Sequence, residues 1–193
     1  LQGLTLNVMS GVGNRGANLG LNGNYRKGKM GFSLGGFGRG FYNPAAGQLN
    51  QITRLDSITR RTSQSSTSKE QGLFGHYQFG WDYDIDKNNA ITASVRFGAR
   101  NRLSQQALTT SLFENELLNR TSYRDVDSKD LSNTVDVNVD YTRQLGKPQQ
   151  ELSILTQFSR NNRTNNFIAD LLDSRRIVTG REQNDNDSYN QES

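Results

Sequence analysis

One histidine and two aspartates could together perform acid–base chemistry. His76, Asp82 and Asp84 all occupy even positions, so an extended strand would carry them on one face. They stretch from position 76 to position 84, however, which spreads them along the strand. The chain has no cysteine and no second histidine, which excludes a thiolate nucleophile and a multi-histidine metal site within one copy. We therefore expect no catalytic activity and no cofactor.

Two further patterns have the spacing of ligand-binding motifs. Gly11-x-Gly13-x-x-Gly16 matches a dinucleotide-binding loop, but an alternating strand follows where such a site needs a helix. Asp82-x-Asp84-x-Asp86 begins like a calcium-binding loop, but it lacks that loop's later glycine and glutamate. We interpret the glycines as a turn or bulge and the aspartates as part of a strand, with weak cation binding left open.

Arginines cluster in two polar segments that could bind anionic ligands or lipopolysaccharide phosphates. They are Arg54, Arg60 and Arg61 in the first segment and Arg175, Arg176 and Arg181 in the last. The alternative interpretation is a solvated polar surface. Aromatic residues and most strand charges fall on opposite faces, so we expect no nucleic-acid binding.

Alternation of apolar and polar residues is the main structural signal, and it predicts at least six strands. The alternating stretches are 19–25, 30–34, 73–85, 91–99, 131–141 and 152–158. At Gly35-Gly36 the apolar residues change from even to odd positions, because Phe37 and Phe41 follow. We expect a glycine bulge at this point.

Short turns and long polar segments alternate between these strands. We predict hairpins at about 18–42, 71–103 and 131–160, and long polar loops at about 44–70, 104–130 and 164–193, in one section covering 1–193. The segments 105–118 and 167–173 could hold a helical turn. Lys27-Gly28 and Gly146-Lys147 suit two-residue turns that pair Tyr25 with Met30 and Tyr141 with Leu152. A slightly longer loop around Lys87 keeps neighbouring apolar residues on one face.

Strands of this length, with short turns at one end and long loops at the other, are typical of an outer-membrane β-barrel. The fold class we predict is all-β, with antiparallel hairpins forming part of such a transmembrane barrel. The mean hydropathy of −0.79 is compatible with it, because only every second strand residue of a barrel faces lipid.

Two sets of residues follow from this prediction. Aromatic side chains near the strand ends are candidates for the membrane interface: Tyr25, Trp81, Tyr83 and Tyr141 by the short turns, and Phe97 and Phe158, with Phe41-Tyr42 and Phe74, toward the other end. Polar side chains on the opposite face are candidates for lining the lumen: Asn22, Asn24, His76, Asp82, Asp84, Arg96, Asp136 and Asp140.

Parts of the sequence resemble TonB-dependent-receptor-type outer-membrane proteins. The resemblance covers about residues 3–163 and is carried by the runs Leu4–Gly13, Asn18–Phe32, Asp140–Ser153 and Gln157–Asn161, with turns of the Tyr-Arg-Lys-Gly-Lys type. Members of this family are much longer, with an N-terminal plug inside about 22 strands. This chain shows neither a plug nor an energy-coupling box, so we expect a section of a larger barrel.

The resemblance implies a bacterial outer-membrane location and a role in the uptake of a nutrient ligand. It further implies four partners: membrane lipid and lipopolysaccharide, the remainder of the barrel with its plug, an inner-membrane energy-coupling protein acting through the plug, and the ligand itself. Two alternatives stay open at the level of sequence. One is a soluble antiparallel β-sandwich or barrel that acts as a binding or adhesion module, and the other is a small closed eight-stranded barrel.

Overall fold

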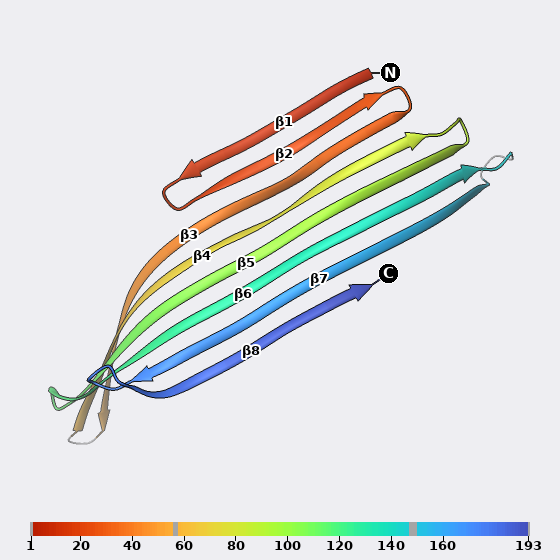
Figure 1. Cartoon of the computed structure of the whole chain (residues 1–193). Coiled ribbons are helices and arrows are strands. Elements are labelled where there is room, and N and C mark those ends of the chain that lie inside the picture. The colour runs from red at the N-terminus through yellow and green to blue at the C-terminus, as the bar shows by residue number, and fades with distance from the viewer. Residues whose placement is uncertain (1, 56–57, 147–149, 193) are drawn as a thin grey trace.

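The computed structural model describes residues 2–55, 58–146 and 150–192, and these form a single antiparallel sheet (Figure 1). The strands are β1 (Gln2–Gly13), β2 (Gly16–Lys27), β3 (Met30–Leu55), β4 (Ile58–Asp84), β5 (Asn89–Glu114), β6 (Leu117–Gln144), β7 (Glu151–Leu172) and β8 (Val178–Glu192). Each strand pairs with the next along the chain, which gives the order β1 to β8. The all-β, antiparallel prediction is confirmed, with eight strands where the alternation indicated at least six.

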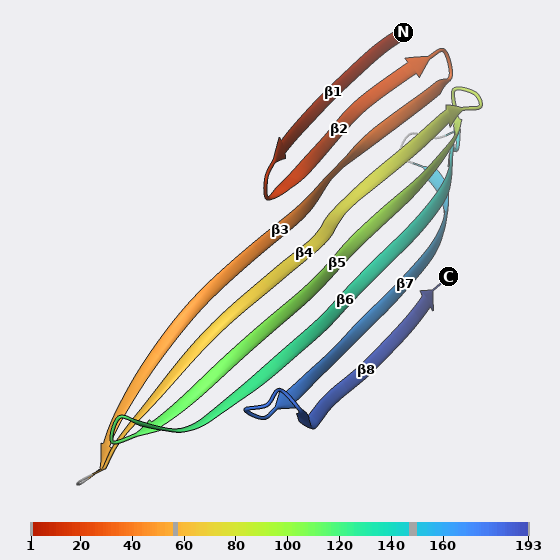
Figure 2. The same cartoon turned by 60° about the vertical axis from the view of Figure 1, so that its left-hand side comes forward.

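The sheet is a single curved layer, and no second layer of the described chain covers either side (Figure 2). Ala169 is the one buried hydrophobic side chain among the residues with a described environment. A soluble β-sandwich needs a second sheet packed on the apolar side, and the described residues provide none. Within these ranges no helix is long and apolar enough to cross a membrane.

Alternation places apolar and polar side chains on opposite faces, because residues directly opposite in an antiparallel pair point the same way. One row across β1–β7 is Leu6, Gly23, Leu34, Phe79, Val95, Val137 and Phe158. The adjacent row is Asn7, Asn22, Gly35, Gln78, Arg96, Asp136 and Ser159. We name the two sides the apolar face and the polar face after these rows.

The apolar residues form a band that occupies only one end of the apolar face. On β4 this apolar band runs from Tyr83, beside the β4–β5 turn, to Leu73, and on β6 from Tyr141 to Leu131. Its length is close to the roughly 9–11 residues that a tilted transmembrane strand needs. Beyond the band, β3–β6 continue for a similar distance with polar residues on both faces. We call these continuations the outer halves.

The long polar loops predicted at about 44–70, 104–130 and 164–193 are wrong. Residues 44–55 and 58–70 belong to β3 and β4, 104–114 and 117–130 to β5 and β6, and most of 164–192 to β7 and β8. The helical turns expected at 105–118 and 167–173 are likewise absent from the described chain. Ser, Thr and Gln on both faces remove the apolar–polar contrast on which the alternation test depends. Thr nevertheless favours strands, and the adjacent strands are long enough to form hydrogen bonds with the backbone of these segments.

The β2–β3 and β4–β5 connections are short turns, as predicted, but the β2–β3 turn lies one residue later than expected and two registers differ from the prediction. Tyr25 lies opposite Phe32, not Met30, because the β2–β3 turn consists of Gly28 and Lys29. Gly28 has φ of 61°, and a glycine adopts that conformation without steric penalty. Tyr141 lies opposite Ile154, not Leu152. Lys147, in the predicted Gly146-Lys147 turn, lies outside the described residues.

The β4–β5 turn keeps the predicted facing, since Tyr83 lies opposite Ile91 and Phe79 opposite Val95. The glycines at 11, 13 and 16 form a hairpin instead of a dinucleotide loop, with Gly13 opposite Gly16 around a two-residue turn. The closed eight-stranded barrel is not formed by the described residues, because β1 and β8 do not pair with each other.

The bulge predicted at Gly35-Gly36 is wrong, because the ladders from β3 to both β2 and β4 pass through these residues without a shift. Gly36 has φ of 150°, and a Cβ there would overlap the carbonyl oxygen of His76 on β4. The glycine therefore absorbs the local distortion while the register stays continuous. As a result, Phe37 and Phe41 lie on the polar face.

These two neighbouring glycines make a matched test of the register. We expect Gly36→Ala to lower the free energy of unfolding by about 1–3 kcal/mol, because alanine disfavours this φ and its Cβ meets the backbone of β4. A Cβ at Gly35 meets no atom within 4 Å, so Gly35→Ala should leave the stability unchanged or raise it by up to about 1 kcal/mol. Thermal loss of the β-sheet circular dichroism signal in detergent measures both. Equal effects would contradict the described environment of Gly36.

Candidate functional site

All the residues predicted to line a lumen lie on the polar face. They are Asn22, Asn24, His76, Asp82, Asp84, Arg96, Asp136 and Asp140. Four of the eight make polar side-chain contacts with other strands; among them, the Arg96 guanidinium donates to Gln78 Oε1 at 3.0 Å, and Ser159 Oγ donates to Asp136 Oδ1 at 2.6 Å. The shared face follows from the register, whereas lining a lumen stays a prediction.

His76 and the two aspartates are not brought together. Asp82 is six residues along β4 from His76, which corresponds to about 20 Å of strand. Asp82 and Asp84 instead bind Arg26 of β2, with 2.7 Å between Arg26 Nη1 and Asp82 Oδ2. This contact crosses β3 at Gly31, where a Cβ would overlap the Asp82 carboxylate. The aspartates therefore link β4 to β2 across β3 near the short turns. They do not form an acid–base pair with His76.

Asp86 lies in the β4–β5 turn and organises it. Its carboxylate accepts the backbone N–H of Asn88 at 2.8 Å and the side-chain amide of Asn89 at 2.7 and 2.8 Å. The Asn88 hydrogen bond is the main reason that the pKa of Asp86 lies below its ordinary value. Within the described ranges, no group of three or more histidine or acidic side chains is placed to hold a metal ion. The calcium-loop pattern thus corresponds to a turn and an ion-paired strand end.

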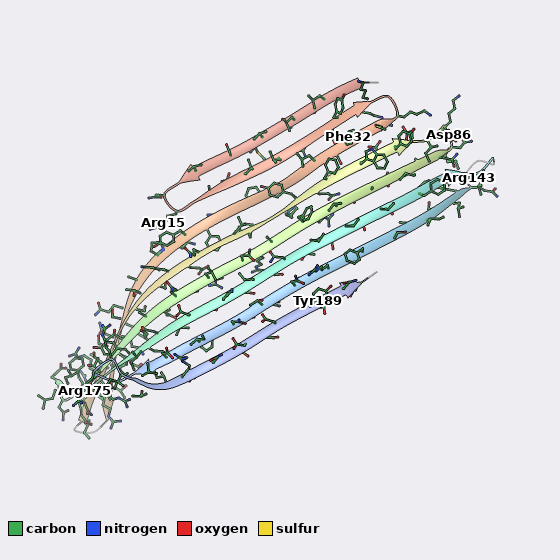
Figure 3. The ribbon with its side chains drawn as sticks, in the orientation of Figure 1. Arg15, Phe32, Asp86, Arg143, Arg175 and Tyr189 are labelled. Carbon is green, nitrogen blue, oxygen red and sulfur yellow. The ribbon has the colours of Figure 1, made fainter. Side chains whose placement is uncertain are left out.

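The aromatic residues expected at the short-turn end gather on the apolar face. They lie within the last few residues of the apolar band, next to the short turns: Tyr25, Trp81, Tyr83 and Tyr141. The rings of Trp81 and Tyr83 stack with centroids 6.0 Å apart. Tyr141 directs its hydroxyl toward the turn end, where it donates to Asn89 Oδ1 at 2.7 Å. Figure 3 shows Phe32, which stacks on Tyr25, at this same end of the sheet as Asp86.

The second row of aromatic residues, expected at the far edge of the band, is not formed as predicted. Phe97 lies opposite Tyr77 and Val135, and Phe158 lies opposite Val137, so both are on the apolar face but inside the band. Phe41 and Phe74 are on the polar face, so assigning them to this row is wrong. Phe41 changes face because the expected bulge at Gly35-Gly36 does not occur, whereas the even position of Phe74, which it shares with His76, already indicated the polar face.

The sequence pattern did not single out Tyr77, which bridges three strands on the apolar face. Its hydroxyl donates to the backbone carbonyl oxygen of Leu19 on β2 at 2.9 Å and crosses β3 to reach it. A Cβ at Gly38 would lie 2.8 Å from this hydroxyl. The alternating glycines of β3 opposite a tyrosine were the signal that could have indicated the bridge.

Half of the six arginines proposed to bind anions are paired within the chain. Arg60 lies 3.5 Å from Glu114, and Arg61 lies 3.1 Å from Glu116. Arg181 binds both oxygens of Asp170 at 2.6 and 2.9 Å. This pairing lowers the pKa of Asp170 and raises that of Arg181. The paired arginines fasten the outer parts of neighbouring strands to each other.

Comparison with models of known families, with curated proteins and with solved structures finds no match.

The Asp86 turn generates a pH prediction. Because the carboxylate accepts its hydrogen bonds only in the folded chain, its folded pKa lies below the unfolded value of about 3.9. The stability it contributes is therefore fully present above that value and is lost as the pH falls through the lowered pKa. The carboxyl carbon shift of Asp86, assigned with Asp86→Asn and followed by NMR in detergent, should titrate below about pH 3.9. A midpoint at or above the ordinary value would refute the described turn.

Proposed function

We propose that the chain forms a section of the wall of a bacterial outer-membrane β-barrel of the TonB-dependent-receptor type. The apolar band faces lipid, and the polar face lines the lumen. The observation that carries the proposal is a one-sided apolar band of transmembrane length, with stacked tyrosine and tryptophan rings at its short-turn end. Such rings favour the headgroup layer, where their bodies are apolar and their tips polar.

The exposure of the band supports lipid as its environment. Phe97 is 56 % exposed, Ile154 55 % and Leu73 50 %, although all three lie within a continuous sheet. Water would oppose so large a contiguous apolar surface, whereas a bilayer supplies the apolar contacts that a core otherwise provides. Every interior strand pairs on both sides, which also meets the requirement that backbone groups in lipid be hydrogen-bonded.

The two ends of the sheet support different parts of this role. The outer halves carry polar residues on both faces, which suits strands that extend beyond the membrane into water and help to capture a nutrient ligand. The free edges of β1 and β8 present unpaired backbone groups that the remainder of the barrel would satisfy. Energy would reach the barrel from an inner-membrane protein acting through a plug, and the chain itself would make or break no bond.

Single cysteines at four cross-strand positions test which face meets lipid. Val95 and Val137 lie directly opposite each other on the apolar face, and Ser94 and Asn138 form the adjacent pair on the polar face. With an environment-sensitive fluorophore at each site in liposomes, a lipid-phase quencher should reduce the emission at the two valine positions. The serine and asparagine positions should instead respond to a water-soluble quencher.

The neighbouring pairs control for depth, because they differ by one residue along the same two strands. If Val95 and Val137 are shielded from both quenchers while Ser94 and Asn138 stay wet, the apolar face packs against protein. The chain would then be part of a soluble β domain, and the transporter proposal would be wrong.

A further inference from the structure

Four phenylalanines lie on the polar face; three of them belong to the adjacent strands β3 and β4, and the fourth, Phe167, lies on β7. Phe37 and Phe41 are on β3 and Phe74 is on β4, and together we call them the aromatic cluster. Phe37 is 38 % exposed and Phe74 41 %, with ring centroids 6.2 Å apart and planes inclined by 55°. If the apolar face meets lipid or a protein core, these rings remain on the side that meets water.

Two of the phenylalanine rings lie over glycines of the neighbouring strands. A Cβ at Gly72 would lie 2.8 Å from the Phe41 ring, so that ring covers the glycine. A Cβ at Gly20 would lie 3.3 Å from the end of Met9 and 3.7 Å from the Phe37 ring. The Phe37 and Phe41 rings therefore lie over glycines, and the Arg39 side chain comes from the position between them on the same face of β3.

Two arginines without acidic partners lie on either side of Phe74. Arg39 on β3 and Arg100 on β5 are the residues directly opposite Phe74 on its two sides, and both are exposed. Neither forms an ion pair with any residue whose position is described. Other arginines of the same face do: Arg102 lies 2.9 Å from Glu70, and Arg163 lies 3.8 Å from Asp130. Arg96, farther along β5 on the same face, also lacks an acidic partner, but its guanidinium donates to Gln78.

We propose that the aromatic cluster, with Arg39 and Arg100, binds a cyclic molecule that carries a carboxylate. One face of its ring is planar or apolar, and the carboxylate is attached at the edge of the ring. The phenylalanine rings supply the stacking surface. A guanidinium binds a carboxylate through two parallel N–H···O hydrogen bonds. Because Arg39 and Arg100 lie on either side of Phe74, the ligand can direct its carboxylate toward either arginine. Aromatic carboxylates and sugar acids share this chemistry.

The inference goes beyond the proposed uptake role and does not rest on it. The site requires only that the polar face be open to water, which holds for a barrel lumen and also for the outer surface of a soluble domain. Lipid-quenching results at Val95 and Val137 therefore neither support nor weaken it.

Fluorine NMR of the chain in an uncharged detergent tests the site with small probes. 4-Fluorobenzoate represents the aromatic carboxylates, fluorinated glucuronate represents the sugar acids, and 4-fluorobenzamide is the neutral analogue. We expect saturable binding of at least one carboxylate and none of the amide. Arg100→Gln should weaken that binding about tenfold, since it removes a charge-assisted hydrogen bond. Phe74→Leu should weaken it while keeping the surface apolar.

Arg96→Gln is the matched control. It removes the same charge from the same face of β5, four residues from Arg100, where the guanidinium is already bound to Gln78. Circular dichroism of each variant shows whether the sheet is intact. Equal losses for Arg96→Gln and Arg100→Gln, equal binding of the amide, or no saturable binding of either carboxylate would overturn the proposal. Binding of only one carboxylate would support it and identify the class.

Discussion

Cross-strand backbone pairing is the interaction on which every other feature of this chain depends. The described residues form one layer, and Ala169 is their single buried hydrophobic side chain. Packing of a core therefore does little to select one arrangement over another. The hydrogen-bonded register decides which side chains meet, and a slip of one residue would exchange the two faces of a strand. The two faces of this sheet differ so strongly that such a slip would be heavily disfavoured wherever one face is apolar.

Glycines in β3 extend this pairing from two strands to three. Arg26 on β2 reaches Asp82 on β4 over Gly31, and on the other face Tyr77 on β4 reaches Leu19 on β2 over Gly38. Both contacts require that the residue they cross on β3, the middle strand, has no side chain. They connect next-nearest strands and so resist shear between the β1–β2 hairpin and the longer strands. The short hairpin is thereby fixed to the body of the sheet on both of its faces.

The alternation in the sequence was sufficient to predict the strands of the apolar band and the face of each residue in it. Val95 and Asp136 fall where their parity predicted, because apolar and polar neighbours differ there at every step. The same test failed in the outer halves, where Ser66 and Thr67 occupy opposite faces of a strand with no apolar contrast between them. Strand formation at those positions depends on partners far along the chain, which a local pattern does not contain.

The failure at Gly35-Gly36 has a different physical origin and a larger consequence. A change of apolar parity can be accommodated by a bulge, which keeps the apolar residues on one side, or by a continuous register, which transfers them to the other. The sequence pattern is the same in both cases. In the structure Gly36 adopts a φ that other residues disfavour, so the ladder continues and Phe37 changes face. Aromatic rings then stand among arginines on the hydrophilic side, where stacking and charge can act on the same ligand.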